Sequence, residues 1–315
     1  MRPFPFDQQT EAGYVGPEWQ ERTGVAQLAQ VLFRKAEDQF LMLAFYGDGS
    51  GEHGNGPFVV AGYLADSIDW FHLECDWERE LKKSPSIRYF KARECVLRQQ
   101  GNGSKEFSGE FFGWTTDAVR RKCTAMAQVL ESYSPRMVAI CSPMHWDVYH
   151  GVVGDDVFRQ VFWTPYLFCA HGAIELALKK SNEQFKLYRG PVAFVFDTES
   201  AQLDADTRQH YDLAPNHLPS DLRSRCGSLT FTDDIKFPML QPADFLAWSI
   251  RAQRAGQESP WVDTIFTNFA GGSHEIIMRP ARLREIIRDT EDKFHKEYPD
   301  WKSQQVSLKA RKKKK

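Results

Sequence analysis

The chain has 315 residues, of which 42% are hydrophobic, 13% aromatic and 26% charged. This is a globular composition, and it is long enough for one large domain or two small ones. No apolar run approaches the ~20 residues that a membrane-spanning helix needs, and the first residues, from Met1 to Phe4, lack a signal-peptide core. We therefore expect a cytoplasmic protein that does not enter a membrane.

Cysteine spacing and charge distribution narrow the class further. Six cysteines are scattered without a C-x-x-C pair, which argues against a zinc knuckle or a disulfide framework. The formal net charge is −2, yet the segment from Lys309 to Lys315 alone holds six positive charges. Such a tail on an acidic body binds phosphate backbones without reading sequence, and it is equally typical of a solvated end without a role.

The first predicted element is a β-hairpin. Short apolar runs bounded by turn residues predict strands at 40–45 and 58–64, with Asp48 in the glycine-rich turn between them. Residues 49–54 match the G-x-G-x-x-G dinucleotide pattern, but that pattern works only where a helix begins at its third glycine. Here Asn55-Gly56-Pro57 and a second strand follow, so we set dinucleotide binding aside.

The remaining predicted elements alternate between helices and strands. The first is a helix at 67–83, capped by Ser67, with Ile68, Phe71, Cys75 and Leu81 on its apolar face. It is followed by a strand at 87–92, a loop at 99–113, a helix from Thr115 or Thr116 to about 133, and a strand at 137–141. A helix at 155–180 with an irregularity at Thr164-Pro165 comes next, and then a strand at 191–196, a helix at 204–214, a strand at 228–231, and helices at 238–255 and 280–298.

This alternation predicts an α/β layer fold with one mixed sheet flanked by helices. We divide the chain into an N-terminal lead-in (1–38), a main domain (39–256), a C-terminal helical extension (257–305) and a basic tail (306–315).

Acidic residues occupy selected positions in these elements. Asp48 follows the first strand, Asp197 ends the strand at 191–196, and Asp244 lies one turn into an otherwise apolar helix. Strand ends converge at one edge of an α/β sheet, and a carboxylate on an apolar helix face needs a partner. Glu94, just past the third strand, is the leading fourth carboxylate, and Glu199 is its rival.

Gathered carboxylates repel one another unless cations neutralise them. Their hard oxygen ligands suit Mg²⁺ or Mn²⁺, and two such ions ~3.5–4 Å apart activate water and stabilise the leaving oxygen of a phosphodiester. The predicted catalytic residues and metal ligands are therefore the same four side chains: Asp48, Glu94, Asp197 and Asp244.

This order of acids resembles the ribonuclease H-like nuclease superfamily. More specifically, residues from about 40 to 255 resemble the bacterial family called domain of unknown function 3800, whose hallmarks are an Asp-Glu-Ser-Gly turn after the first strand and a late Gln-x-Ala-Asp helix. The matching segments here are Asp48-Gly49-Ser50-Gly51, Gln241-Pro242-Ala243-Asp244 and the stretch from Tyr89 to Glu94. The chain departs from the family at Gly49, which stands in place of the Glu.

The resemblance implies a ribonuclease H-like fold with a nuclease-like site. The first hypothesis is a Mg²⁺- or Mn²⁺-dependent phosphodiesterase with nucleic acid as its partner. The second is a catalytically degenerate binding module, which the missing Glu at Gly49 favours. The third is a hydrolase of a small phosphorylated metabolite. The sequence does not decide whether the protein forms a homodimer. It also leaves open whether the substrate is DNA or RNA and whether the enzyme is an endonuclease or an exonuclease.

Overall fold

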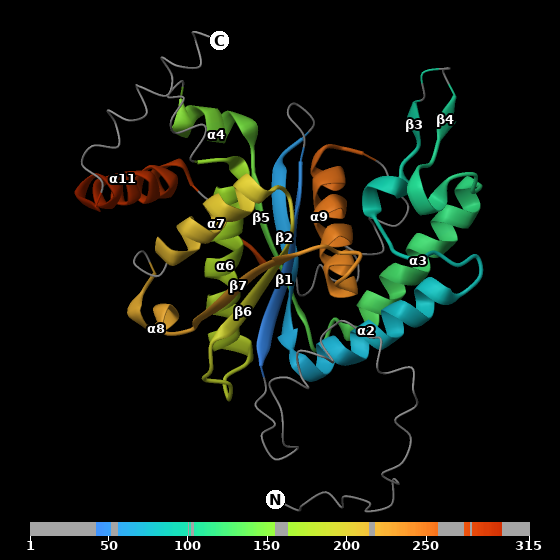
Figure 1. The fold of residues 1–315 in the computed structure, drawn as a ribbon, viewed down its shortest axis with the longest axis horizontal. Coiled ribbons are helices and arrows are strands. Elements are labelled where there is room, and N and C mark those ends of the chain that lie inside the picture. Colours follow the sequence, from blue (N-terminus) through green and yellow to red (C-terminus); the bar gives the residue numbers. More distant parts are fainter. Residues whose placement is uncertain are drawn as a thin grey trace, which may run out of the picture.

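The computed structural model describes residues 42–51, 56–99, 101, 104–154, 163–213, 218–257, 274–277 and 279–297. These residues form an α/β fold around one mixed six-stranded sheet, as the sequence predicts, with the strand order β7-β6-β1-β2-β5-β8 (Figure 1). The strands are β1 (Leu43–Ser50), β2 (Phe58–Asp66), β5 (Val138–Met144), β6 (Val192–Asp197), β7 (Cys226–Thr232) and β8 (His274–Glu275). The predicted lead-in and basic tail lie outside the described residues, and the division into domains stays a prediction.

The predicted hairpin is confirmed, but its first strand is longer at the carboxyl end. β1 pairs with β2 antiparallel from Leu43 opposite Asp66 to Ser50 opposite Val59. Asp48 therefore lies inside β1, opposite Ala61, and not in a turn. The valine-rich start of β2 continues the hydrogen-bonded ladder, and this pairing overrides the low strand preference of the glycines.

The strands beside the hairpin set the direction of the sheet. β6 runs parallel to β1, and β7 runs parallel to β6, whereas β5 runs antiparallel to β2. The carboxyl ends of β1, β6 and β7 therefore meet at one edge of the sheet, which is the edge where α/β folds place their sites.

Helices cover both faces of the sheet (Figure 1). One face carries α2 (Ser67–Lys82), α3 (Thr116–Tyr133) and α9 (Gln241–Arg254), and the other carries α4 (Trp146–Val153), α6 (Pro165–Gln184), α7 (Ala201–Leu213), α8 (Ser220–Arg223) and α11 (Pro280–Glu297). A hydrophobic core lies on each face of the sheet, and alternate residues of β1 belong to one core or the other. Ala44 and Tyr46 pack beneath α9, while Leu43 and Phe45 pack on the face that α6 covers. None of the described helices is both long and apolar enough to cross a membrane.

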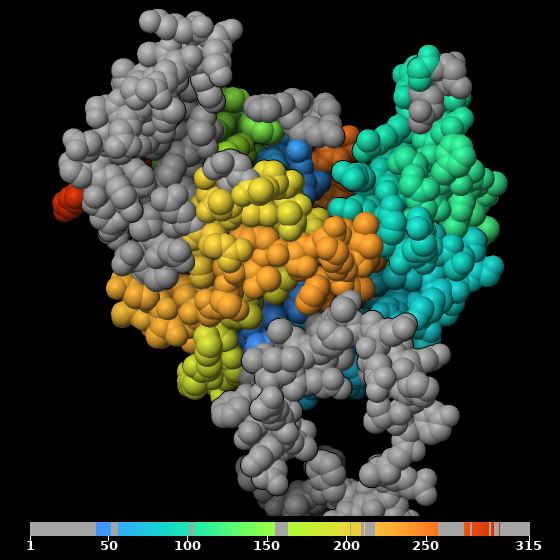
Figure 2. All heavy atoms as spheres, in the orientation of Figure 1, coloured from blue at the N-terminus to red at the C-terminus, as the bar shows by residue number. Residues whose placement is uncertain are grey.

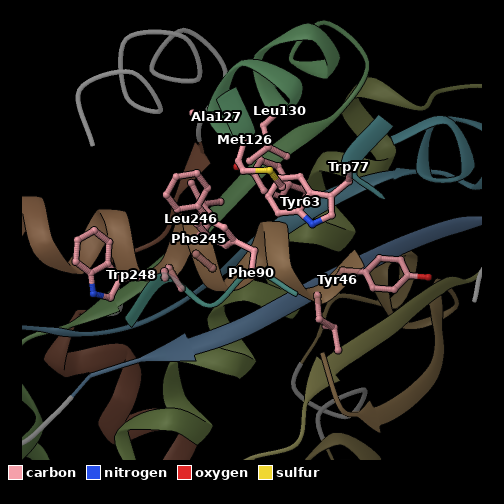
Figure 3. Packing of buried hydrophobic residues seen from close by; sticks show 14 of the residues in the cluster. Tyr46, Tyr63, Trp77, Phe90, Met126, Ala127, Leu130, Phe245, Leu246 and Trp248 are labelled. Carbon is pink, nitrogen blue, oxygen red and sulfur yellow. The ribbon is translucent and has the colours of Figure 1, made fainter. Parts of the chain in front are cut away.

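Aromatic packing fixes the segment that follows α2 against α9. The ring of Phe90 lies 4.7 Å from that of Phe245 and 5.8 Å from that of Trp77, between α9 and α2 (Figure 3). All three side chains are fully buried. Tilted and edge-on aromatic contacts of this kind add to the burial of apolar area, so they hold the residues around Phe90 firmly in place.

The predicted strand at 87–92 is wrong. This segment is irregular and leads into a 3₁₀-helix, η2 (Ala92–Cys95). The N–H of Phe90 donates to Gln241 Oε1 (3.1 Å), and the N–H of Ala92 donates to Asp244 Oδ2 (2.7 Å). Side chains of α9 therefore take the place of a neighbouring strand as hydrogen-bond partners. The predicted loop at 99–113 contains part of a small ribbon, β3 (Arg98–Gln99) with β4 (Lys105–Glu106), and a second 3₁₀-helix, η3 (Gly109–Phe111).

The start of α2 and its buried face also differ from prediction. Asp66, not Ser67, caps the helix, because its Oδ1 accepts from the N–H groups of the second and third residues after it. The buried face is built mainly from Trp70, Leu73 and Trp77; the predicted Leu81 is buried with them, whereas Ile68 is 51% exposed. These three large side chains recur at helical spacing and meet the sheet, which outweighs the smaller apolar set chosen from the sequence.

The long helix predicted at 155–180 begins later. α6 starts at Pro165, with Thr164 as its cap, because proline at the first helical position loses no hydrogen bond. Residues 155–162 lie outside the described residues. α4, α8 and β8 are additional elements that the sequence did not predict. The predicted strands at 137–141, 191–196 and 228–231 and the helices near 116–133, 204–214, 238–255 and 280–298 are confirmed, with small shifts at their ends; the 238–255 helix begins as a 3₁₀ turn, η5 (Pro238–Leu240).

Candidate active site

A cavity of about 380 Å³ lies at the carboxyl ends of β1 and β6. Three of the four acids predicted from the sequence line it, namely Asp48, Asp197 and Asp244, together with the rival Glu199. Figure 2 shows this face of the molecule, with blue atoms of the β1–β2 region visible between the yellow atoms of α7 and the cyan atoms that follow α2. The other lining residues are Gly49, Ser50, Gly51, Phe58, Lys91, Arg93, Arg98, Thr198, Trp248 and Arg251.

Strand pairing brings Asp48 and Asp197 together. β1 and β6 are parallel, and Gly47 is paired with Phe196, so the next residue on each strand is an aspartate. Side chains alternate between the faces of a sheet. Asp48 follows Tyr46 by two positions and Asp197 follows Val195 by two, and Tyr46 and Val195 both belong to the core beneath α9. Both aspartates therefore point to the α9 face.

α9 brings Asp244 to the same place. The helix packs on β1 and β2, and its first turn carries the Gln-Pro-Ala-Asp motif. Gln241, which is 1% exposed, accepts from Trp77 Nε1 (2.9 Å) and donates to the carbonyl oxygen of Asp234 (3.0 Å). Asp244 accepts the N–H of Ala92. The motif thus fastens three segments around the cavity.

Lys91 places a positive charge among these acids. Its Nζ lies 2.9 Å from Asp234 Oδ2 and 3.4 Å from Asp197 Oδ2. Burial alone lowers the pKa of Lys91, but the hydrogen bond to Asp234 and the charges of Asp234 and Asp197 outweigh it and raise the pKa above its ordinary value. The ammonium therefore stays charged over the whole pH range in which the acids titrate.

The carboxyl groups of the cavity hold their protons more tightly than free carboxyls. Burial, and then the charges of Asp244, Asp197 and Glu199, raise the pKa of Asp48 well above its usual value. Burial raises the pKa of Asp244 to about 6, against the opposing effects of the Ala92 N–H and of Lys91. Partial burial and the charge of Asp197 raise the pKa of Glu199 to about 7, although its side chain reaches the surface at the rim. Negative charge is thus in excess, even with Lys91 present.

Glu94 has a different place. It is buried outside the cavity lining, where its carboxylate accepts the hydroxyl of Tyr89 (3.2 Å) and the N–H of Glu110 (3.0 Å). Gly109 has a φ of +55°, and a Cβ there would lie 2.0 Å from the Glu94 carboxylate. Glu94 therefore joins η2 to η3, in a position that only glycine at 109 permits.

Glu199 fills the space beside Gly49. A Cβ at position 49 would lie 3.0 Å from Glu199 Oε1 and 3.0 Å from the ring of Tyr166. The carboxylate that the resemblance places on residue 49 is absent, and a carboxylate from the loop after β6 stands next to that position.

Sequence reasoning missed Asp234 and the basic rim. Asp234 follows β7 as Asp197 ends β6, so the strand-end criterion that identified Asp197 also applies to it. Three arginines line the mouth of the cavity: Arg93, Arg98 and Arg251, the last of which donates from Nε to Ser50 Oγ (3.1 Å). Their signal in the sequence is weak, because they come from η2, β3 and α9.

The donor set suits a hard cation, although the side chains do not surround one as they stand. Within the described ranges, no three His, Cys, Asp or Glu side chains are grouped closely enough to hold a metal ion. However, Asp48 and Asp244 each have one carboxylate oxygen to which no described residue donates. Carboxylate oxygens are ligands that Mg²⁺ and Mn²⁺ favour, and a bound ion would replace the protons that these buried groups retain, so these residues fit such an ion.

All six cysteines lie within the described residues as free thiols. They are Cys75, Cys95, Cys123, Cys141, Cys169 and Cys226, and none lines the cavity.

No protein-family model matches this sequence, and no curated protein matches it either.

Proposed function

We propose that the protein is a Mg²⁺- or Mn²⁺-dependent phosphodiester hydrolase acting on nucleic acid. The observation that carries the proposal is the composition of one cavity: it is lined by carboxylates from β1, β6 and α9, those of Asp48 and Asp244 buried, and by three arginines. Carboxylates in excess attract a divalent cation, and guanidinium groups bind phosphate. A cavity that attracts both is suited to a phosphodiester.

The proposed roles follow the positions of the side chains. Asp48 and Asp244 hold the cation through the oxygens that lack a described donor. Glu199, rather than Glu94, is the further carboxylate at the mouth, where it orients the attacking water. A bound divalent ion supplies Lewis-acid polarisation of a phosphoryl oxygen. Arg93, Arg98 and Arg251 bind the phosphates on either side of the scissile bond.

A ribonuclease H-like fold is part of this proposal. Its support is the hairpin-first mixed sheet, in which an aspartate of the first strand, a strand-ending aspartate and a helix aspartate line one cavity. The resemblance at the sequence level implies this arrangement.

The test is a panel of labelled single- and double-stranded DNA and RNA, incubated with the full chain and Mn²⁺. We expect Asp48→Asn and Asp244→Asn each to lower the cleavage rate more than about 100-fold, because loss of an outer-shell partner alone costs 10–100-fold. Circular dichroism confirms that the variants fold. Asp221→Asn, on an exposed residue of α8 outside the cavity, is the matched control. Cleavage that survives both cavity substitutions contradicts the proposal.

Two alternatives each have an observation in their favour. Among the residues that the structure describes, no three metal-ligating side chains are closely grouped, which favours a catalytically degenerate binding module. The volume of about 380 Å³ lies in the range of small-molecule sites, which favours a small phosphorylated metabolite as substrate. The panel separates them: binding of oligonucleotides without cleavage supports the module, and turnover of nucleotides but not oligonucleotides supports the metabolite.

A further inference from the structure

Lys91 is fixed in position by the residues on either side of it. The N–H groups of Phe90 and Ala92 are both held by side chains of α9, and the Phe90 ring is buried against Phe245. The Lys91 side chain is only 18% exposed. Its ammonium is therefore held in the cavity by the surrounding packing, unlike a surface lysine that can swing away.

The ammonium forms ion pairs with two carboxylates in one half of the cavity. Asp197 Oδ2 faces Lys91 Nζ, and Asp197 Oδ1 accepts the N–H groups of Thr198 (3.0 Å) and Asp234 (3.3 Å). Asp234 Oδ2 forms the shorter ion pair with Lys91, and the Asp234 side chain is 3% exposed. Both oxygens of Asp197 are thus engaged, and the single positive charge of Lys91 offsets part of the negative charge of this half.

The other half is farther from full pairing: the charge of Lys91 acts on Asp48 and Asp244, but it forms no ion pair with them. Asp48 Oδ1 accepts only the N–H of the next residue, Gly49 (2.6 Å), and Asp244 Oδ2 accepts only the N–H of Ala92 (2.7 Å). No described cation forms an ion pair with either carboxylate. The two halves therefore differ: β6 and the loop after β7 face a lysine, while β1 and α9 have carboxylate oxygens open to a cation.

We infer that Lys91 takes the place of a second metal ion, so that the cavity holds one divalent cation, between Asp48 and Asp244. This inference rests on the proposed function and refines it. A second ion at Asp197 would have to displace the ammonium or lie beside it, where two positive charges at short range repel strongly. Mg²⁺ also requires near-octahedral oxygen coordination, which a fully engaged Asp197 does not offer.

The test counts Mn²⁺ ions bound to the metal-free full chain, by titration calorimetry and by the electron paramagnetic resonance signal of unbound Mn²⁺. We expect one ion for the wild type and for Lys91→Arg, which keeps the positive charge. We expect two ions for Lys91→Met, with the first bound at least about tenfold more tightly because the neighbouring charge is gone. Circular dichroism checks folding.

The outcomes separate the inference from the proposed function. Two ions bound to the wild type overturn the inference and leave the proposed function in place, and this count needs no variant to fold. One ion of equal affinity in the wild type and in a folded Lys91→Met also overturns the inference. If neither protein binds Mn²⁺, the metal site itself is wrong, and the proposed function is contradicted together with the inference.

Discussion

Asp244 serves two purposes that act on stability in opposite directions. Its Oδ2 accepts the N–H of Ala92 and so fixes the segment that carries Lys91. Its charge, however, is buried near Asp234 and Asp197, which contributes to a pKa of about 6. A residue kept ionised at such a position is typical of functional sites, where stability is given up for chemistry.

The first prediction concerns this residue. Asp244→Asn keeps an acceptor for the N–H of Ala92 and removes a buried negative charge that destabilises the folded state at pH 8. The free energy of unfolding in urea of the metal-free variant should therefore be higher by about 1–2 kcal/mol. The same variant should lose Mn²⁺ binding. The control Asp221→Asn should change the unfolding free energy by less than about 0.5 kcal/mol. A destabilised Asp244→Asn variant would show that the carboxylate is a structural element only.

The second prediction separates the two glutamates. Glu199→Gln should lower the cleavage rate by about 10–100-fold, because the carboxylate lies in the cavity, as expected for a group near the metal. Glu94→Gln should leave the rate within about threefold of the wild type but should lower the melting temperature, because Glu94 joins η2 to η3. Steady-state rates and thermal melts of both variants test this prediction. The reverse pattern would show that Glu94, and not Glu199, is the fourth carboxylate of the site.

At the scale of elements, the sequence predicts what local periodicity controls. The strand ending in Asp197 is found from its apolar run, α3 from its threonine cap and apolar spacing, and α9 from the proline in its first turn and its apolar spacing. The segment at 87–92 alternates like a strand, yet its partners are side chains of Gln241 and Asp244, about 150 residues further on. Such long-range side-chain pairing leaves no local signal, so the prediction fails there.

The third prediction tests this long-range link. Gln241→Leu removes the acceptor for Trp77 Nε1 and for the N–H of Phe90, which are both buried, and should lower the unfolding free energy by about 2–4 kcal/mol. Gln253→Leu, at an exposed position of the same helix, should stay within about 0.5 kcal/mol of the wild type. Urea unfolding of the two variants measures the difference. Equal stability would mean that Gln241 does not anchor the segment.

At the scale of the whole molecule, only part of the candidate site can be predicted from the sequence. Strand-end position and helix burial identify Asp48, Asp197 and Asp244, and the structure brings these three to one cavity. Neither criterion specifies the direction of a side chain in an irregular segment. The sequence therefore does not tell whether the side chains of Glu94 and Lys91 enter the cavity. The direction of each of these side chains depends on how η2 packs against α9, which is a property of the complete fold.

The fourth prediction is a pH dependence of the metal-free protein. The folded pKa values of Asp244 (about 6) and Glu199 (about 7) exceed their ordinary values of 3.8 and 4.5, so the folded state binds more protons than the unfolded state between these limits. The unfolding free energy should therefore be highest near pH 4 and fall as the pH rises to about 7, by on the order of 3 kcal/mol from Asp244 alone. Urea unfolding across this range measures it.

Two comparisons control this measurement. In Asp244→Asn the fall with pH should be smaller, because one of the titrating groups is gone. Saturating Mn²⁺, at about 100 times its dissociation constant, should add about 2.7 kcal/mol near pH 8 and less near pH 5, where protons compete for the same oxygens. Stability that rises steadily from pH 4 to pH 7 without metal would contradict the charge balance described for the cavity.

The central claim is that carboxylates from β1 and α9 form the site of a divalent cation beside Lys91. The most direct test is the anomalous difference map of a crystal soaked in Mn²⁺. We predict one peak within about 2.5 Å of carboxylate oxygens of both Asp48 and Asp244, with Lys91 Nζ still against Asp234. A map without a peak in this cavity, from crystals that show Mn²⁺ bound elsewhere on the protein, would contradict it.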